Sequence, residues 1–130
     1  MAQYPSDLKY TKDHEWARVE DGGKVRIGVT AYAVEQLGDV TLIDLPSVGD
    51  DVNAHDRFGD IESVKTVSEL FAPISGTIVE VNDALEDQPE LVNDSPYDKG
   101  WMVVLEASSL GELDSLMDAA EYEAHLGALD

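Results

Sequence analysis

The sequence of 130 residues contains no cysteine, so it cannot form disulfide bonds or a thiolate metal site. Its histidines, His14, His55 and His125, are too dispersed to suggest a zinc motif. No apolar run approaches the roughly 20 residues that a membrane-spanning helix needs, and residues 1–9 lack the charged-then-apolar pattern of a signal peptide. We therefore expect a soluble, cytoplasmic protein with no metal and no membrane partner.

Basic residues are scarce as well. The sequence has 8 lysines and arginines against 28 aspartates and glutamates, which gives a formal net charge of -20, and no lysine or arginine follows Lys99. Nucleic acid is a poor partner for such a protein, because phosphate binding needs a basic surface. A hydrophobic content of 43% and two tryptophans favour a folded core over an acidic disordered chain. The acids would then coat a globular surface, which indicates a high-salt, halophilic cytoplasm.

The size and residue content do not indicate an enzyme. A chain of this length fits one domain, residues 1–130, with a modest core but little room to enclose a substrate and a cofactor. We find no converging set of nucleophile, base and oxyanion donors, and no glycine loop that would bind phosphate. The other classes are a carrier and an unmodified structural or interaction module, and an intact mass would distinguish these two.

Strand patterns dominate the sequence. Residues 14–29 predict a hairpin, because alternating side chains flank the turn residues at 20–23. Further predicted strands are a buried one at 40–45, another at 77–81 and a central one at 101–105. Residues 8–10 could begin a strand, and residues 83–99 are expected to be mostly loop with short structured pieces.

Two helices complete the expected fold. Thr30 can cap a short helix near 31–37 that Gly38 ends. Ser109 and Glu112 form a capping-box pattern for a C-terminal helix at about 109–126. Its apolar stripe is expected to pack on the strands rather than to bind a partner; the stripe consists of Leu113, Leu116, Met117 and Ala120. The predicted fold class is mainly β.

Residues 58–76 predict another β-hairpin, in which residues 63–66 form the reversal between two short strands. Lys65 would protrude from this turn as a distinctive amine, with the acids Glu62 and Glu69 on either side. An isolated surface lysine in a loop is nearly always a solvated charge. The position of Lys65 alone therefore indicates no function.

Residues 62–66 read ESVKT, and after an apolar strand residues 72–76 read APISG. This arrangement resembles the lipoylation region of glycine cleavage system H proteins, which usually have E-S-V-K-A and then A-P-x-S-G. Lipoyl domains of 2-oxo-acid dehydrogenases usually carry D-K-A and biotinyl domains M-K-M, and neither fits Val64-Lys65-Thr66. The resemblance extends over nearly the whole chain through YTKDHEW (10–16), EQLGD (35–39), SPYDKGW (95–101) and the Glu121-Tyr122 pair. Thr66 departs from the usual alanine.

The resemblance implies a lipoyl/biotinyl-type sandwich, the barrel-sandwich hybrid, and a carrier that is not itself an enzyme. It implies that Lys65 carries lipoate in amide linkage. In the family, glycine decarboxylase loads an aminomethyl group onto a lipoyl sulfur, aminomethyltransferase passes the one-carbon unit to tetrahydrofolate, and dihydrolipoamide dehydrogenase reoxidises the dithiol. These enzymes and a lipoate-attaching enzyme are the expected partners. The alternative is an H-like protein that mainly relays lipoate to other lipoyl domains.

A carrier of a cationic aminomethyl group is expected to protect it in a cleft lined by acids. By the resemblance, Glu15 and Glu69 match positions near the parked arm, and His14 is either an arm contact or a structural hydrogen-bonding residue. Asp13 and Gln36 match positions of more variable residue type. An ordinary solvated side chain is the alternative for each. The lack of cysteine agrees with a lipoyl carrier, because a nearby thiol could attack the dithiolane.

Overall fold

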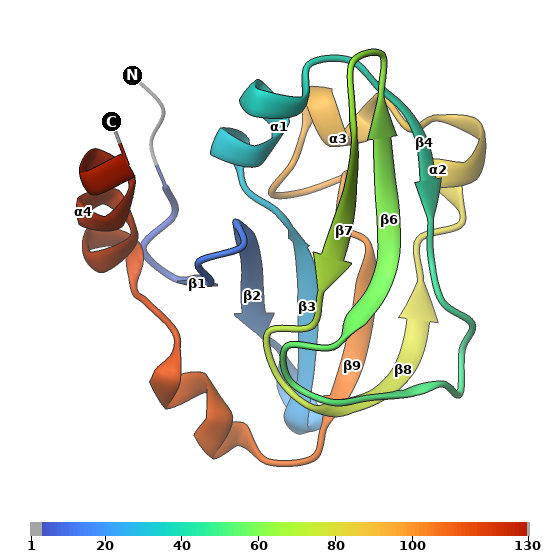
Figure 1. Cartoon of the computed structure of the whole chain (residues 1–130). Helices are drawn as coiled ribbons and strands as arrows, with labels where there is room; N and C mark the ends of the chain where they lie inside the picture. The colour runs from blue at the N-terminus through green and yellow to red at the C-terminus, as the bar shows by residue number, and fades with distance from the viewer. Residues whose placement is uncertain (1–3, 130) are drawn as a thin grey trace.

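The computed structural model describes residues 4–129, which form two antiparallel β-sheets with short helices around them (Figure 1). The strands are β1 (Lys9–Tyr10), β2 (Glu15–Val19), β3 (Lys24–Val29), β4 (Val40–Asp44), β5 (Asp51–Val52), β6 (Arg57–Ser63), β7 (Val67–Phe71), β8 (Gly76–Val81) and β9 (Val103–Ala107). The helices are α1 (Ala31–Leu37), α2 (Ala84–Asp87), α3 (Leu91–Asp94) and α4 (Ala119–Leu129), and the 3-10 helices are η1 (Asp21–Gly23) and η2 (Leu110–Ser115).

The larger sheet has six strands in the order β1-β2-β3-β9-β8-β5, and the smaller sheet has three in the order β4-β6-β7. Every pair of neighbouring strands is antiparallel. The mainly β fold class is thereby confirmed. The apolar run at 101–105 contributes to β9, which is central as predicted because it pairs with β3 and β8, although the strand begins at Val103.

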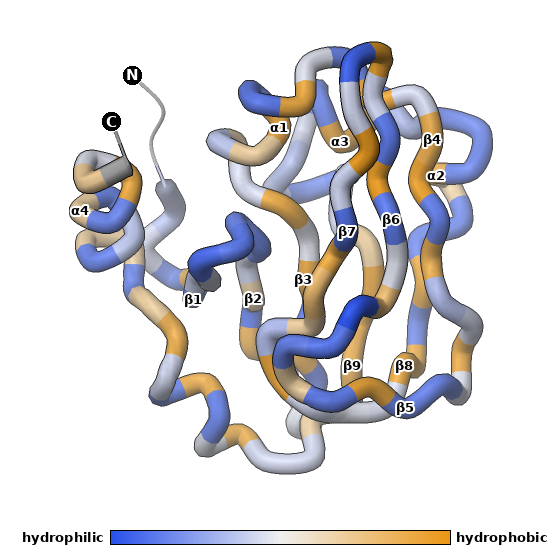
Figure 2. The backbone as a smooth tube through the Cα atoms, viewed as in Figure 1, coloured by the Kyte–Doolittle hydropathy of each residue, from blue (hydrophilic) through white to orange (hydrophobic). Residues whose placement is uncertain are grey.

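The main core lies between the two sheets. Ile27 and Leu105 of the larger sheet are buried in one cluster with Ile61 and Leu70 of the smaller sheet. Hydrophobic and hydrophilic residues alternate along parts of the strands (Figure 2). In β8, for example, the buried Ile78 lies between the less buried Thr77 and Val79. Each buried aliphatic side chain contributes roughly 1.5–3 kcal/mol. The core therefore holds the β6–β7 hairpin firmly against the larger sheet.

A second cluster covers the other face of β2. Trp16 is fully buried there beside Tyr10 and Tyr122, so both faces of β2 are packed. The residue paired with Trp16 on β3 is Gly28, where a Cβ atom would lie 2.6 Å from the tryptophan ring. Only glycine fits at that position. The aromatic cluster attaches α4 and the β1 segment to this side of the molecule (Figure 1).

Several local predictions are confirmed. The hairpin predicted at 14–29 is formed by β2 and β3. The short helix is α1, in which Thr30 Oγ1 accepts a hydrogen bond from the Ala33 N–H at 3.3 Å and Gly38, with a φ of 76°, ends the helix. The short structured pieces expected within 83–99 are α2 and α3.

The strand predicted at 40–45 is β4, but the prediction that it is buried is wrong. Leu42 is 50% exposed, whereas Val40 and Ile43 are buried. Two features explain the difference. β4 is an edge strand of the smaller sheet, and its register with β6 shifts between Val40 and Leu42, which disturbs the regular alternation of faces.

The C-terminal helix is present, but the prediction that it starts at about residue 109 is wrong. α4 begins at Ala119, and the segment before it is the 3-10 helix η2. Glu112 does not cap the chain at Ser109. Its carboxylate instead accepts hydrogen bonds from the N–H and the hydroxyl of Ser75, at 3.0 and 3.1 Å. A contact to a distant loop therefore replaces the local capping box.

The capping box of α4 is formed by Asp118 and Glu121. The Glu121 N–H donates to Asp118 Oδ1 at 2.8 Å, and the Asp118 N–H donates to Glu121 Oε1 at 3.1 Å. Just before this box, Met117 and Tyr10 exchange backbone hydrogen bonds of 2.8 and 2.9 Å, so the chain is extended where a helix was predicted. The predicted apolar stripe is divided as a result: Leu113 packs in the main core and Met117 packs against the aromatic cluster.

Candidate functional site

The β6–β7 hairpin holds Lys65 at its tip, as predicted (Figure 1). The Ser63 N–H donates to the Thr66 carbonyl oxygen at 2.8 Å. The Ser63 hydroxyl oxygen accepts from the Lys65 and Thr66 N–H groups at 3.4 and 3.2 Å. These contacts close a tight turn around an exposed lysine side chain.

The hairpin tip is also attached to the end of α1. The Val64 N–H donates to the Asp39 carbonyl oxygen at 3.2 Å. The Lys65 side chain passes over Gly38, where an added Cβ atom would lie 3.5 Å from Lys65 Cε and 3.9 Å from Nζ. The stem of Lys65 therefore starts from a fixed place between the hairpin and α1.

A cleft of ≈ 160 Å³ lies beside this tip, between β7 and α1. It is lined by Asp13, His14, Glu15, Val29, Ala33, Gln36, Leu37, Ile61, Thr66, Ser68, Glu69 and Leu70. All five residues predicted near an arm cleft are brought together here. Lys65 is not among the lining residues, but its neighbour Thr66 is. Three carboxyl groups line the cleft, and no lysine or arginine does so within the described part of the chain.

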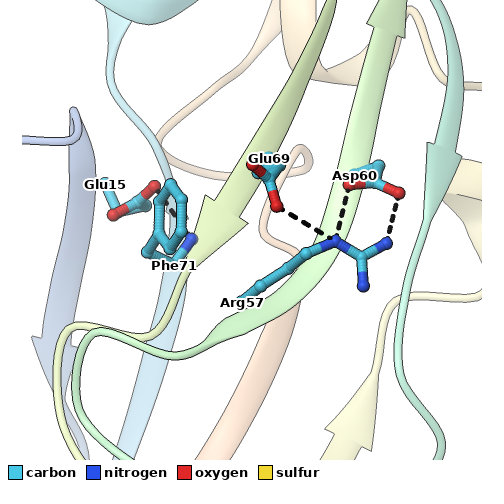
Figure 3. A network of polar contacts seen from close by, with 5 residues as sticks. All are labelled: Glu15, Arg57, Asp60, Glu69 and Phe71. Atoms are coloured by element: carbon cyan, nitrogen blue, oxygen red, sulfur yellow. Dashed lines mark hydrogen bonds and ion pairs between the residues drawn. The ribbon is translucent and has the colours of Figure 1, made fainter.

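Glu15 is the buried acid of the cleft, with 2% of its surface exposed. The Thr11 hydroxyl donates to its Oε1 at 2.9 Å. The Phe71 N–H donates to its Oε2 at 3.3 Å (Figure 3). Burial raises the pKa of Glu15 to about 8, although these two hydrogen bonds act in the opposite direction. Glu15 thus holds a proton at neutral pH.

Glu69 is an exposed acid, and 58% of its side chain is accessible. Its Oε2 lies 3.6 Å from Arg57 Nε, but the Arg57 guanidinium is bound mainly by Asp60, which it contacts through both Nε and Nη2 (Figure 3). An ion pair this exposed contributes little to stability. Glu69 thus lines the cleft while its carboxyl group is turned toward Arg57.

His14 combines an unusual backbone with a distant side-chain contact. Its φ of 70° lies in the left-handed region, and its Nδ1 is 2.8 Å from the hydroxyl of Tyr122 on α4. Burial lowers the pKa of His14, and the nearby His125 acts in the same direction while Asp13 opposes it. His14 is accordingly a neutral imidazole at neutral pH, on the wall of an acidic cleft.

Residues 8–128 match the family described as Glycine cleavage H-protein. The chain belongs to this family. The glycine cleavage system H protein of Geobacillus kaustophilus is 60% identical to this chain, and the match covers 92% of this chain and 94% of that protein. The glycine cleavage system H protein of Bacillus pumilus is 58% identical, and the match covers 92% of this chain and 93% of that protein. A crystal structure of the glycine cleavage system H protein of Mycobacterium marinum matches with a TM-score of 0.88 and 43% identity, covering 95% of this chain and 99% of that one.

The family resemblance that the motifs indicated is thereby confirmed, and so is the lipoyl-type sandwich fold. Members of the glycine cleavage H-protein family are lipoyl carriers, so this chain is a carrier component of the glycine cleavage system and not a catalyst by itself. Within residues 4–129, no group of three or more histidine, aspartate and glutamate side chains is arranged to hold a metal ion. None of the helices there combines the length and hydrophobicity needed to traverse a bilayer.

Sequence reasoning missed three groups that shape the cleft. The Thr11 hydroxyl and the Phe71 amide hold Glu15, and the Tyr122 hydroxyl holds His14. Thr11 left a local signal, because a threonine that precedes a polar turn often accepts backbone hydrogen bonds within it, and here its hydroxyl oxygen accepts from the Glu15 N–H. The contacts of Phe71 and Tyr122 join segments far apart in the chain, and no local pattern indicates them.

Proposed function

We propose that Lys65 carries lipoate as an amide on Nζ and that the chain shuttles aminomethyl groups derived from glycine. The observation that carries this proposal is the exposed Lys65 amine on a fixed hairpin tip, beside a cleft with three carboxyl groups. The lipoyl group would supply a dithiolane that accepts and releases the cargo and can be reduced and reoxidised. The arm needs an exposed attachment point, and the cationic cargo needs an acidic shelter.

The partners in this proposal are four enzymes. Glycine decarboxylase would supply the aminomethyl cargo, aminomethyltransferase would accept it, and dihydrolipoamide dehydrogenase would restore the oxidised state. A separate lipoate-attaching enzyme would modify Lys65. The hairpin suits all four, because the residues around its tip, Val64 to Val67, are exposed to solvent and an enzyme can surround the lysine without unfolding the sheet.

Glu15 has the most direct role in holding the cargo. A cationic amine that enters the cleft stabilises the carboxylate form of Glu15, which lowers its pKa and releases the proton it holds at neutral pH. Glu15 then offers a buried negative charge, and its two hydrogen bonds fix the direction of the carboxylate. Glu69 and Asp13 add attraction from more exposed positions, where solvent screens them.

A lysine exchange tests the proposal. Lys65→Arg keeps the charge but cannot form the lipoyl amide, so the variant is expected to fold normally and to give no glycine decarboxylation with the partner enzymes. Lys24→Arg, at an exposed lysine outside the cleft lining, is the matched control and should remain fully active. Full activity of Lys65→Arg would contradict the assignment.

Three further features belong to this proposal. We take residues 1–130 as one lipoyl-carrier domain, because both sheets share a single main core. We take its place as the cytoplasm, and the net charge of -20 as an adaptation to a high-salt interior. The lipoate-relay role remains the alternative, and transfer of the lipoyl group from this protein to another lipoyl domain would reveal it.

A further inference from the structure

Tyr122 connects α4 to two walls of the cleft. Its side chain is fully buried, and its hydroxyl oxygen lies 2.8 Å from His14 Nδ1 and 2.8 Å from Thr30 Oγ1. His14 lines the cleft directly, and Thr30 is the N-cap of α1, whose Ala33, Gln36 and Leu37 form another part of the lining. α4 contributes no lining residue itself. One hydroxyl group therefore joins this helix to both walls.

The donors and acceptors around Tyr122 fit one order. Thr30 Oγ1 accepts the Ala33 N–H, and among the described residues Tyr122 is the only hydrogen-bond acceptor for the Thr30 hydroxyl hydrogen. The Tyr122 hydroxyl then donates to Nδ1 of a neutral His14. Each hydroxyl is used once as donor and once as acceptor, so the whole chain of hydrogen bonds is satisfied away from solvent.

A hydrogen on Nδ1 of His14, in the other neutral tautomer or in the imidazolium, would break this order. Nδ1–H would donate to Tyr122, and Tyr122 would have to donate to Thr30. The Thr30 hydroxyl hydrogen would then need another acceptor, and the described residues offer it no hydrogen bond other than that to Tyr122. Thr30 is fully buried, so water does not replace the missing partner. The hydrogen-bond chain therefore selects one tautomer of His14, with its hydrogen on Nε2.

The backbone of His14 also depends on the contacts around it. Its left-handed backbone persists only if neighbouring contacts hold it. The Thr11 carbonyl oxygen accepts the His14 N–H at 3.1 Å, and the His14 carbonyl oxygen accepts the Thr30 N–H at 2.9 Å. Thr11 also donates to Glu15, so a movement of His14 would be transmitted to the buried acid of the cleft.

We propose that Tyr122 is a positioning residue for the cleft, whose hydroxyl fixes the ring of His14 and the start of α1 so that the cleft retains its shape around the cargo. The part that concerns cargo rests on the proposed function. Tyr122 is not among the residues that line the cleft, and it acts through His14 and Thr30. Besides Tyr122, titratable side chains near the His14 ring are Asp13, Tyr32 on α1 and His125 on α4, and the last two have ring centroids 4.6 and 6.4 Å from that of His14.

The test compares Tyr122→Phe with Tyr10→Phe. The two rings stack with centroids 4.8 Å apart, and each variant removes one buried phenolic hydroxyl from the same cluster. The Tyr10 hydroxyl donates to the Pro5 carbonyl oxygen and does not reach the cleft lining. A merely structural role of Tyr122 predicts equal effects, whereas a positioning role predicts effects on the cleft from Tyr122→Phe alone.

Two measurements use the protein without lipoate. Nitrogen NMR of the His14 ring should show the Nε2–H tautomer in the wild type and in Tyr10→Phe, and a tautomer mixture in Tyr122→Phe. Amide hydrogen exchange of Ala33 should be faster by about fivefold only in Tyr122→Phe, as expected for the loss of one hydrogen bond. An Nδ1–H tautomer in the wild type would overturn the proposal, even if Tyr122→Phe does not fold.

The third measurement uses protein loaded with aminomethyl cargo. Ammonia release should be faster by about fivefold in Tyr122→Phe and unchanged in Tyr10→Phe. Equal behaviour of the two variants in all three measurements would overturn the role of Tyr122. If the wild type accepts no lipoate at Lys65, the proposed function fails instead, and the two measurements on unmodified protein still decide whether Tyr122 positions the cleft walls.

Discussion

The carboxyl group of Glu15 on β2 accepts a hydrogen bond from the backbone N–H of Phe71 on β7, at 3.3 Å, and thereby joins the larger sheet to the smaller one. The same carboxyl group lines the cleft beside Lys65. Its protonation state is therefore coupled both to the stability of the fold and to whatever cation enters the cleft. Two predictions follow from this position.

The first prediction concerns pH and stability. The ordinary pKa of a glutamate is 4.5, and that of folded Glu15 is about 8. Below pH 4.5 both the folded and the unfolded chain hold this proton. Between pH 4.5 and 8 the unfolded chain loses this proton while the folded chain keeps it, so the free energy of unfolding falls as pH rises. The unfolding constant increases by up to about tenfold per pH unit. Above pH 8 this contribution is constant.

Glu15→Gln removes this titration while it keeps the size of the side chain. The free energy of unfolding of the wild type minus that of the variant, measured by denaturant titration, should fall between pH 5 and 8. Gln36→Asn, at a side chain of the same cleft that cannot titrate, should show no such pH dependence. A wild-type minus Glu15→Gln difference that is constant over this range would show that Glu15 titrates as an ordinary acid.

The second prediction concerns retention of the cargo. Glu15→Gln should increase the rate of ammonia loss from isolated, loaded protein by about tenfold or more, because a buried hydrogen bond to a charged group contributes roughly 1.5–3 kcal/mol. Glu69→Gln should have a smaller effect, since solvent screens its carboxylate. An unchanged rate in Glu15→Gln, or a larger effect from Glu69→Gln, would remove Glu15 from the cargo site.

A third prediction concerns the attachment of the hairpin tip to α1. Gly38 has a φ of 76° and a ψ of -146°, a backbone region that is essentially restricted to glycine. Gly38→Ala should lower the free energy of unfolding by about 1–3 kcal/mol. It should also slow the attachment of lipoate, because the added Cβ would lie 3.5 Å from Lys65 Cε and the strained backbone there would shift the Lys65 side chain.

Gly22→Ala is the control for Gly38→Ala. Gly22 has a similar φ of 76° with a ψ of 22°, and no atom lies within 4 Å of an added Cβ. Its replacement should cost less stability and should leave the rate of lipoate attachment unchanged. Equal rates of attachment in both variants would show that the contact between Gly38 and Lys65 has no influence on modification.

A fourth prediction concerns salt. A formal net charge of -20 on a small protein repels itself more in the compact than in the expanded state. The Debye length falls from about 30 Å at 0.01 M salt to about 3 Å at 1 M, so the melting temperature should rise over the first molar of sodium or potassium chloride. Any further rise at higher concentration would come from strengthened apolar burial. A flat or falling melting temperature below 1 M would contradict the proposed high-salt adaptation.

The hairpin at the centre of the site could be predicted because its determinants are local. The turn at Lys65 closes through contacts of Ser63 with residues two and three positions away. The start of α4 could not be predicted in this way. Two capping boxes compete in the sequence, and the one at Ser109 loses because Glu112 binds Ser75, which is 37 residues away.

The cleft shows the same division between local and distant determinants. The family resemblance indicated Glu15 and Glu69, but the burial that raises the pKa of Glu15 depends on packing between two sheets. The contact of His14 with Tyr122 joins residues 108 positions apart. Local patterns thus identify which residue types are available, and the tertiary fold determines which of them are buried, protonated or held in position.

The most direct test of the central claim is peptide-resolved mass spectrometry of the protein from its native cells. Lys65 lies in a hairpin whose tip is exposed, and the claim is that this residue alone carries the lipoyl arm. We predict a fraction of the chains with the mass of one added lipoyl group, located by fragmentation on Lys65 and absent from the other lysines. A lipoyl group on a different lysine, or chains that remain unmodified while the cells cleave glycine, would contradict the claim.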